Sequence, residues 1–108
     1  MVVITDEIEN IKNALVKALP IEKLYLFGSY AYGTQTDESD YDFYILIPDD
    51  SMRPIEATIK ARKSISSIKR SIPVDILTNY NSQFEQRKLF NTLEKKISQE
   101  GVLLYERT

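Results

Sequence analysis

The sequence contains no cysteine and no histidine, two residue types that carry much of enzyme chemistry. The absence of cysteine excludes disulfides, thiolate zinc sites and cysteine nucleophiles. The absence of histidine excludes a Ser-His-Asp triad, a histidine general base and imidazole metal ligands. Chemistry must therefore come from carboxylates, hydroxyls, amines and backbone groups. Oxygen ligands of this kind suit Mg²⁺, Mn²⁺ or Ca²⁺.

Glycine and proline are also scarce, at three and four residues, which excludes a collagen-like or linker-like chain. Hydrophobic residues make up 43% and charged residues 28%, as in ordinary globular proteins. The chain has 108 residues, and a domain has roughly 100–200. We therefore expect a single domain over residues 1–108.

The chain has no excess of basic charge and no long apolar run. Lys and Arg number 14 against 16 Asp and Glu, for a net charge of −2, which argues against stand-alone nucleic-acid binding. No apolar run approaches the ~20 residues of a membrane span, and the beginning, MVVITDEIEN, lacks the basic region of a signal peptide. These features predict a cytoplasmic protein with no membrane partner.

Helical periodicity predicts three main helices, at residues 5–19, 54–70 and 82–99. Thr5 and Ser82 are the expected N-caps of the first and the third, and Pro54 suits the first turn of the second. Pro20 and Gly101 are expected to end the first and the third helix. The apolar positions expected to face the core are Ile8, Ile11, Leu15, Ala18, Leu19, then Ile55, Ile59, Ile65, Ile68, and finally Leu89, Phe90, Leu93 and Ile97.

Apolar runs predict strands at residues 23–27, 42–47 and 74–77, and a final short strand at 102–105. Residues 28–39 read as a structured loop or a short helix. Alternation of helices and strands along the chain is typical of a small sheet with helices packed on it. The expected fold class is α/β (α+β), with a mixed sheet.

Three aspartates lie at or near the starts of the second and third predicted strands. Asp40 and Asp42 have the i, i+2 spacing that points both side chains to one face of a strand. Two carboxylates held so close are unfavourable unless a cation lies between them. Asp75, inside an apolar strand, faces the same pair if the second and third strands are neighbours. The three then frame one or two metal ions.

Gly28 and Ser29 follow the first predicted strand. Glycine lets a ligand approach the backbone closely. If a short helix starts there, its free N–H groups favour a phosphate, to which the Ser29 hydroxyl adds a hydrogen bond. A phosphate site and an acid cluster at the same end of one sheet suit phosphoryl or nucleotidyl transfer.

Gly28-Ser29, ten intervening residues and Asp40-x-Asp42 together resemble the signature of the DNA polymerase β-like nucleotidyltransferase superfamily. The short chain is most similar to the minimal nucleotidyltransferases. Gly33, Ser39 and Asp75 also match that pattern. The motifs cover residues 23–78, and the order of elements covers the whole chain.

The resemblance implies transfer of a nucleoside monophosphate from ATP or another NTP to a hydroxyl. It implies that Asp40, Asp42 and Asp75 are catalytic and bind Mg²⁺, two ions in all, and that Asp75 helps to deprotonate the acceptor. The nucleotide-binding residues would be Gly28, Ser29, Gly33 and Ser39. The chain departs from the family at Tyr32, where an arginine or lysine is common, so a phosphate-facing charge is missing there.

Many minimal nucleotidyltransferases are paired with a helical HEPN-type toxin and act as its antitoxin by adding AMP to a tyrosine. The resemblance implies the same role here, that of a protein adenylyltransferase. The alternative is a catalytically weak member of the fold that neutralises its toxin by complex formation, which Tyr32 and the small size favour. Small-molecule transfer is a third interpretation, disfavoured by the lack of an additional helical domain.

Simpler interpretations of the same residues exist. The stretch from Asp37 to Asp42 could be a solvated acidic loop, and Asp75 could pair with a nearby lysine or arginine. Arg62, Lys63, Lys69 and Arg70 could contact nucleotide or an RNA acceptor, although such residues more often form the solvated face of a helix.

Overall fold

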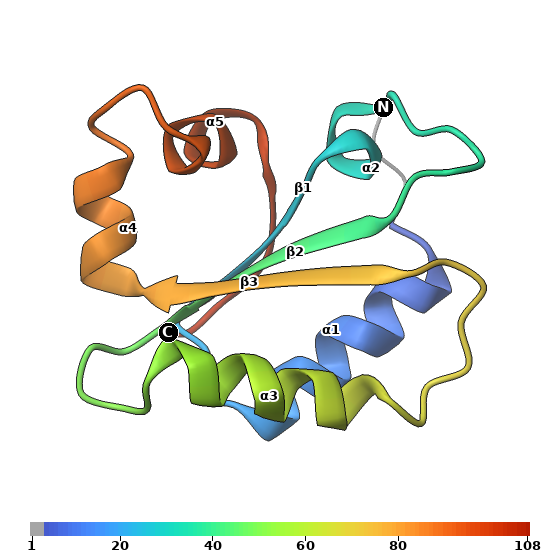
Figure 1. Cartoon of the computed structure of the whole chain (residues 1–108), viewed down its shortest axis with the longest axis horizontal. Helices are drawn as coiled ribbons and strands as arrows, with labels where there is room; N and C mark the ends of the chain where they lie inside the picture. Colours follow the sequence, from blue (N-terminus) through green and yellow to red (C-terminus); the bar gives the residue numbers. More distant parts are fainter. Residues whose placement is uncertain (1–3) are drawn as a thin grey trace.

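The computed structural model describes residues 4–108. Its elements, in chain order, are α1 (Asp6–Ala18), β1 (Lys23–Phe27), α2 (Ser29–Tyr32), β2 (Tyr41–Ile47), α3 (Pro54–Ile65), β3 (Val74–Tyr80), α4 (Asn81–Arg87), α5 (Leu93–Glu100) and β4 (Val102–Glu106). The helices pack on both sides of a twisted sheet (Figure 1). This order confirms the predicted fold class, and the segment at residues 28–39 contains a short helix.

The strands form one sheet in the order β3-β2-β1-β4. β1 is antiparallel to both β2 and β4, whereas β2 and β3 run parallel and are linked through the crossover helix α3. The sheet is therefore mixed, as predicted. β3 is longer than its predicted range of 74–77, because it continues to Tyr80.

The two faces of the sheet carry different helices: α1 and α3 lie on one side, and α2, α4 and α5 on the other (Figure 1). Alternate residues of β2 serve the two faces. Phe43, Ile45 and Ile47 join the main core with α1 and α3. Tyr44 and Leu46 join a second, largely aromatic cluster.

Helix α1 forms as its sequence predicts. Thr5 caps it, since its side-chain oxygen accepts a hydrogen bond from the Ile8 N–H at 3.2 Å. Ile8, Ile11 and Leu15 are buried along one side. The helix ends at Ala18, two residues before Pro20.

The prediction for the second main helix was wrong at its end and for part of its buried side, although Ile65 is buried as predicted. α3 stops at Ile65 rather than at residue 70, and Arg70 donates a hydrogen bond to the Ile65 carbonyl group at 2.9 Å. Ile55 and Ile59, expected in the core, are 60% and 51% exposed. The buried positions are Ala57, Ala61 and Ile65, because small side chains let α3 lie close to α1 and the sheet.

The predicted helix at residues 82–99 is in fact two helices, α4 and α5. Thr92 separates them, because its hydroxyl donates to the Arg87 carbonyl oxygen at 2.7 Å and accepts from the Lys95 N–H at 3.2 Å. Leu89, Phe90 and Leu93, expected in the core, are 73%, 68% and 43% exposed, whereas Ile97 is buried as predicted.

The ends of this region also differ in part from prediction. Ser82 lies within the first turn of α4, and Tyr80 occupies its N-cap position. Gly101 ends α5 as predicted, and a Cβ atom there would lie 2.6 Å from the Ile97 carbonyl oxygen. Of the helices in residues 4–108, none is long and apolar enough to cross a membrane.

Candidate active site

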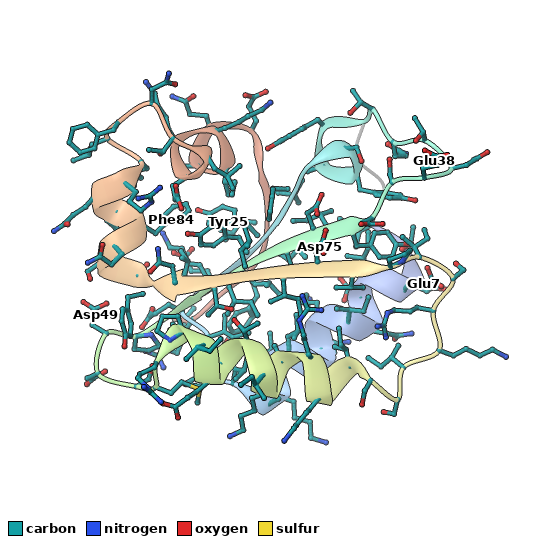
Figure 2. All side chains as sticks on the ribbon, in the orientation of Figure 1. Glu7, Tyr25, Glu38, Asp49, Asp75 and Phe84 are labelled. Atoms are coloured by element: carbon teal, nitrogen blue, oxygen red, sulfur yellow. The ribbon has the colours of Figure 1, made fainter. Side chains whose placement is uncertain are left out.

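Asp42 and Asp75 face each other across the parallel pair β2–β3. The register of the two strands sets Asp42 directly opposite Asp75. Both lie on the face that carries α2, α4 and α5, because Asp42 has the same strand parity as the buried Tyr44. Asp75 lies in the part of this face between α2 and the α4–α5 pair (Figure 2). The conditional prediction that Asp75 faces the acid pair is met for Asp42.

Asp42 is the electrostatic centre of the acid group. Burial, together with the nearby carboxylates of Asp75 and Asp40, raises the pKa of Asp42 from its ordinary 3.8 to about 6. Both other aspartates are therefore close enough to repel it. The interpretation of the stretch from Asp37 to Asp42 as a solvated acidic loop does not fit Asp42, which is partly buried, whereas Asp37 and Glu38 are exposed. Nor do the salt bridges found in residues 4–108 include one for Asp75.

The chemistry of this group suits a hard divalent cation. It offers only carboxylate oxygens, the donors that Mg²⁺ prefers, and a cation there would relieve the repulsion at Asp42. As placed in residues 4–108, no three acidic side chains are close enough together to hold one ion between them. Binding of one ion by all of Asp40, Asp42 and Asp75 stays a prediction.

Gly28 brings the end of β1 against the acid group. Its φ of +76° is a conformation that other residues rarely adopt, and a Cβ atom there would lie 2.1 Å from Asp42 Oδ2. Any side chain at position 28 would thus displace the Asp42 carboxylate. Ser29, the first residue of α2, follows Gly28 directly along the chain.

Gly33 and Ser39 shape the loop between α2 and β2. Gly33 ends α2 in the left-handed conformation, with φ of +77°. The Ser39 hydroxyl accepts a hydrogen bond from the Thr36 N–H at 2.8 Å. These features shape the loop and do not involve a ligand, so the nucleotide-binding role of these two residues stays a prediction.

A buried polar network lies at the other end of this face, and it was not predicted from the sequence. The Tyr44 hydroxyl donates to Glu94 Oε2 at 2.7 Å, and Arg87 Nε lies 3.1 Å from Glu94 Oε1. Burial raises the pKa of Tyr44. Burial alone would raise the pKa of Glu94 as well, but the hydrogen bonds it accepts hold that pKa below its ordinary value. In the sequence, Glu94 looks like an ordinary acidic residue on a helix. In the structure, the break at Thr92 starts a new helix, and Glu94 in its first turn is buried.

Tyr32 packs its ring beneath a lysine from the distant α5. Lys96 Nζ lies 4.8 Å from the centre of the Tyr32 ring. The Tyr32 hydroxyl is buried and has no hydrogen-bond partner in residues 4–108. A positive charge thus lies against α2 even though position 32 itself carries none.

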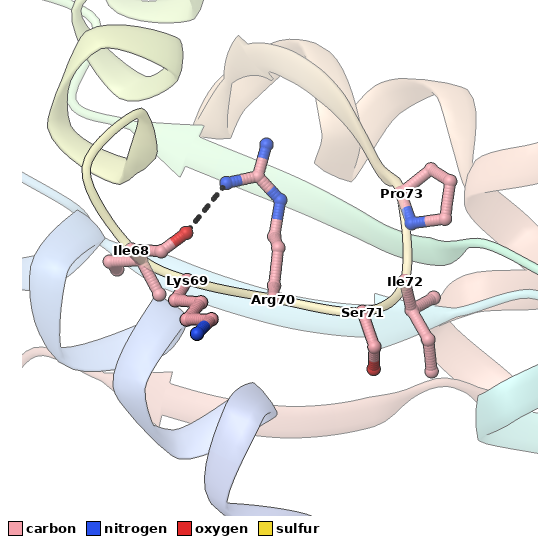
Figure 3. A pocket seen from close by; sticks show the side chains of 6 residues that line it. All are labelled: Ile68, Lys69, Arg70, Ser71, Ile72 and Pro73. Carbon is pink, nitrogen blue, oxygen red and sulfur yellow. Dashed lines mark hydrogen bonds between the residues drawn. The ribbon is translucent and has the colours of Figure 1, made fainter.

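Two surface pockets lie away from the acid group, along the loop between α3 and β3. One, of about 450 Å³, is lined by residues 68–73 (Figure 3). The other, of about 380 Å³, includes Glu7, whose carboxylate accepts hydrogen bonds from the Ser71 N–H and the Tyr41 hydroxyl, both at 2.9 Å. Arg70 donates hydrogen bonds to the carbonyl groups of Ile65 and Ile68. These contacts hold the loop, and neither pocket includes an aspartate of the acid group.

Comparisons with known proteins identify a family for this fold. The family model described as "Polymerase beta, Nucleotidyltransferase" matches residues 9–108. No curated protein matches the chain.

Three solved structures share the fold. A nucleotidyltransferase structure from Sulfolobus solfataricus has a TM-score of 0.59 and 20% identity, covering 94% of this chain and 78% of that one. A toxin-antitoxin structure with AMP-PNP has a TM-score of 0.56 and 24% identity. A toxin-antitoxin MntA-HpeT mutant with two aspartates changed to glutamate has a TM-score of 0.56 and 22% identity. The last two each cover 96% of this chain and 76% of the other.

Proposed function

Because the chain belongs to the polymerase beta nucleotidyltransferase family, we propose that it transfers AMP from ATP to a hydroxyl group of a partner protein. The proposed acceptor is a tyrosine of a HEPN-type toxin in the cytoplasm, so that the chain acts as an antitoxin. The observation that carries this proposal is the register that sets Asp75 opposite Asp42, whose pKa is raised by burial and by the neighbouring acids. The chain is proposed to act as a single domain.

The proposed metal ligands are Asp40, Asp42 and Asp75, which would hold two Mg²⁺ ions, as the family resemblance implies. When bound, the metal supplies positive charge that neutralises the phosphates and the departing pyrophosphate. Gly28 and Ser29 would hold the triphosphate, with Gly33 and Ser39 shaping the adjoining loop. Lys96, whose ammonium lies against α2, would add a cationic contact to the same group.

The proposed reaction is an in-line displacement at the α-phosphorus of ATP. The acceptor oxygen forms a bond to that phosphorus, and the bond from the phosphorus to the bridging oxygen of the β-phosphate breaks. Pyrophosphate leaves with the electron pair of the broken bond. The hydroxyl proton passes to the carboxylate of Asp75, which is exposed on the sheet face where an acceptor would enter.

Two of the similar structures support the antitoxin role. Both are described as toxin-antitoxin structures; one contains AMP-PNP, an analogue of ATP, and the other carries two aspartate-to-glutamate changes. An acid pair and an adenine nucleotide are the two features that the proposal assigns to this chain.

A second candidate function is toxin neutralisation by binding alone. Tyr32 favours it, because the common basic residue is replaced by a ring whose hydroxyl is buried without a partner. In that case the chain would form a complex with the toxin, and nucleotide transfer would contribute nothing to protection.

The test is incubation with Mg²⁺ and α-labelled ATP, with and without the protein encoded by the adjacent gene, followed by gel analysis and intact mass measurement. We expect one or more AMP units on the partner. Asp42→Asn should reduce transfer on the order of 100-fold or more. The matched control is Asp49→Asn, because Asp49 lies at the other end of the sheet (Figure 2). A stable complex with no AMP transfer by the unaltered chain would favour the binding function.

A further inference from the structure

β3 forms one edge of the sheet and borders the acid group. It is paired only with β2 among the strands of residues 4–108 and has seven residues, Val74–Tyr80. In Figure 1 it runs across the front of the molecule, and no other segment is drawn across it. Asp75 lies on this strand, so the open edge and a proposed catalytic residue belong to the same strand.

The backbone groups that face outward from β3 follow from a single hydrogen bond. The Tyr41 N–H donates to the Pro73 carbonyl group at 2.9 Å, and Tyr41 is opposite Val74 in the parallel register. In a parallel pair the residues of one strand alternate between bonding their neighbour and facing away. Pro73, Asp75, Leu77 and Asn79 therefore face β2, while the N–H and C=O groups of Val74, Ile76 and Thr78 point away from the sheet.

The outward N–H groups of β3 end at Pro73 on one side and at Tyr80 on the other. Between these two residues, β3 has few of the features that protect an edge strand from pairing. Pro73 has no N–H to donate, and the Tyr80 N–H is already bonded to Asn79 Oδ1 at 2.8 Å. Asp75 is the only charged residue of β3, and no bulge interrupts its register with β2. Proteins usually protect an edge of this kind with charges, proline or a bulge.

The opposite edge of the sheet is protected in that way. β4 pairs with β1 through a register that shifts between Leu24 and Tyr25. Its last residue, Glu106, forms an ion pair with Lys23 at 3.7 Å. The contrast singles out β3 as the edge left open for pairing with another chain.

The side chains beside the open edge suit a polypeptide acceptor. Asp75 and Leu77 point to the same face as Asp42, and Leu77 is 43% exposed although it is apolar. A chain added to β3 would lie ~4.8 Å from it. A side chain of that added strand, on this face and level with Asp75, would bring its hydroxyl next to the acid group. Leu77 would cover a neighbouring apolar side chain.

We propose that the acceptor protein presents its hydroxyl residue on an extended segment that pairs with the free edge of β3 as an additional strand. This inference rests on the proposed nucleotidyltransferase function and specifies the conformation in which the acceptor segment binds. Main-chain hydrogen bonds to Val74, Ile76 and Thr78 hold the segment, and the register sets which residue reaches Asp75.

The first test compares Thr78→Pro with Thr78→Val in AMP transfer to the protein encoded by the adjacent gene. Both variants lose the hydrogen bond between the hydroxyls of Thr58 and Thr78, which is 3.0 Å long. Only the proline removes the outward N–H and fills the edge with its ring. We expect a loss on the order of tenfold or more for Thr78→Pro relative to Thr78→Val. Thermal stabilisation by Mg²⁺ and AMP-PNP should be the same in both.

The second test needs no variant and no transfer. Amide hydrogen exchange of the unaltered chain is measured alone and in complex with the same partner. In the free chain, the amides of Asp75, Leu77 and Asn79 are expected to be protected by β2 and those of Ile76 and Thr78 to exchange fast. The complex should protect Ile76 and Thr78.

The two tests separate failure of this inference from failure of the proposed function. Transfer without new protection at Ile76 and Thr78, or equal transfer by the two Thr78 variants, would overturn strand addition and leave the transferase function standing. Protection without any transfer would support strand addition and overturn the transferase function. Protection that appears with rising concentration of the chain alone would identify a second copy as the occupant and overturn the inference.

Discussion

The two faces of the sheet are made from alternate residues of the same strands, yet they are covered to different extents. On the α1–α3 face, Phe43, Ile45 and Ile47 are fully buried in the main core. On the other face, Tyr44 is buried under the aromatic cluster, whereas Asp75, one strand away, is exposed. Helices α4 and α5 thus cover one part of this face and leave the part next to α2 open.

This difference separates the residues that stabilise the fold from those proposed to do chemistry. A densely packed face has no room for a ligand. The open part of the other face holds aspartates that repel each other, and Asp42 is kept there although its surroundings disfavour its charge. Groups of this kind are common at functional sites. The comparison predicts that substitutions at packed positions destabilise the fold, whereas a substitution in the acid group stabilises it.

The largest effect on stability is expected on the fully packed face. Ile45→Ala removes a completely buried side chain from the middle of β2 and should lower the free energy of unfolding by about 2–5 kcal/mol. Urea denaturation followed by circular dichroism measures it. Ile59→Ala is the matched control, since Ile59 is 51% exposed, and it should change the stability by less than about 0.5 kcal/mol. Equal effects would contradict the assignment of buried positions.

An intermediate effect is expected in the polar network of the other face. Tyr44→Phe removes the hydroxyl that donates to Glu94 at 2.7 Å and leaves a buried carboxylate oxygen without that donor. The free energy of unfolding should fall by about 1–3 kcal/mol. Tyr105→Phe serves as the control, because no hydrogen bond of the Tyr105 hydroxyl is found in residues 4–108. A loss no greater than in this control would show that the Tyr44–Glu94 bond contributes little.

The smallest effect, and one of opposite sign, is expected at the acid group. Because the pKa of Asp42 is raised in the folded state, ionisation of Asp42 destabilises the fold as pH rises from about 4 to about 6. Asp42→Asn should therefore stabilise the metal-free protein at pH 7. One pKa unit corresponds to ~1.4 kcal/mol, and solvent screening of this partly exposed group reduces the gain to about 1 kcal/mol.

The measurement for Asp42→Asn is a series of urea denaturation curves from pH 4 to pH 8. The difference between variant and unaltered protein should be largest above pH 6 and should vanish near pH 4. Asp49→Asn should show no such dependence. A variant that is less stable than the unaltered protein at pH 7 would contradict the electrostatic account of the site.

Much of the fold could be predicted from short-range signals. The strand at residues 23–27 has the predicted bounds, because an apolar run ends at a glycine that begins the next element. The cap at Thr5 is equally local. The prediction failed where apolar residues are not buried: Ile55 and Ile59 share a helical spacing, but Ala57 and Ala61 allow closer packing and occupy the core side. The size of the side chains between α3 and its neighbours, rather than their hydrophobicity, determined which side of the helix is buried.

The candidate site also has features that could be predicted from local sequence and features that could not. The proximity of Asp40 and Asp42 was predictable from their i, i+2 spacing, although Asp40 lies just before β2, which begins at Tyr41. The position of Asp75 opposite Asp42 depends on a parallel pairing of β2 with β3, which involves residues far apart in the sequence. The inward turn of Glu94 depends on the helix break at Thr92, and the contact between Lys96 and Tyr32 joins two distant helices. Such contacts follow only from the assembled fold.

The central claim is that the open part of the α2–α5 face binds a metal–nucleotide complex through its aspartates. Isothermal titration calorimetry with AMP-PNP, in the presence and absence of Mg²⁺, tests it most directly on the unaltered chain, Asp42→Asn and Asp49→Asn. We expect binding that requires Mg²⁺, is at least about tenfold weaker in Asp42→Asn, and is unchanged in Asp49→Asn. Binding that is independent of Mg²⁺, or equally tight in Asp42→Asn, would contradict the claim.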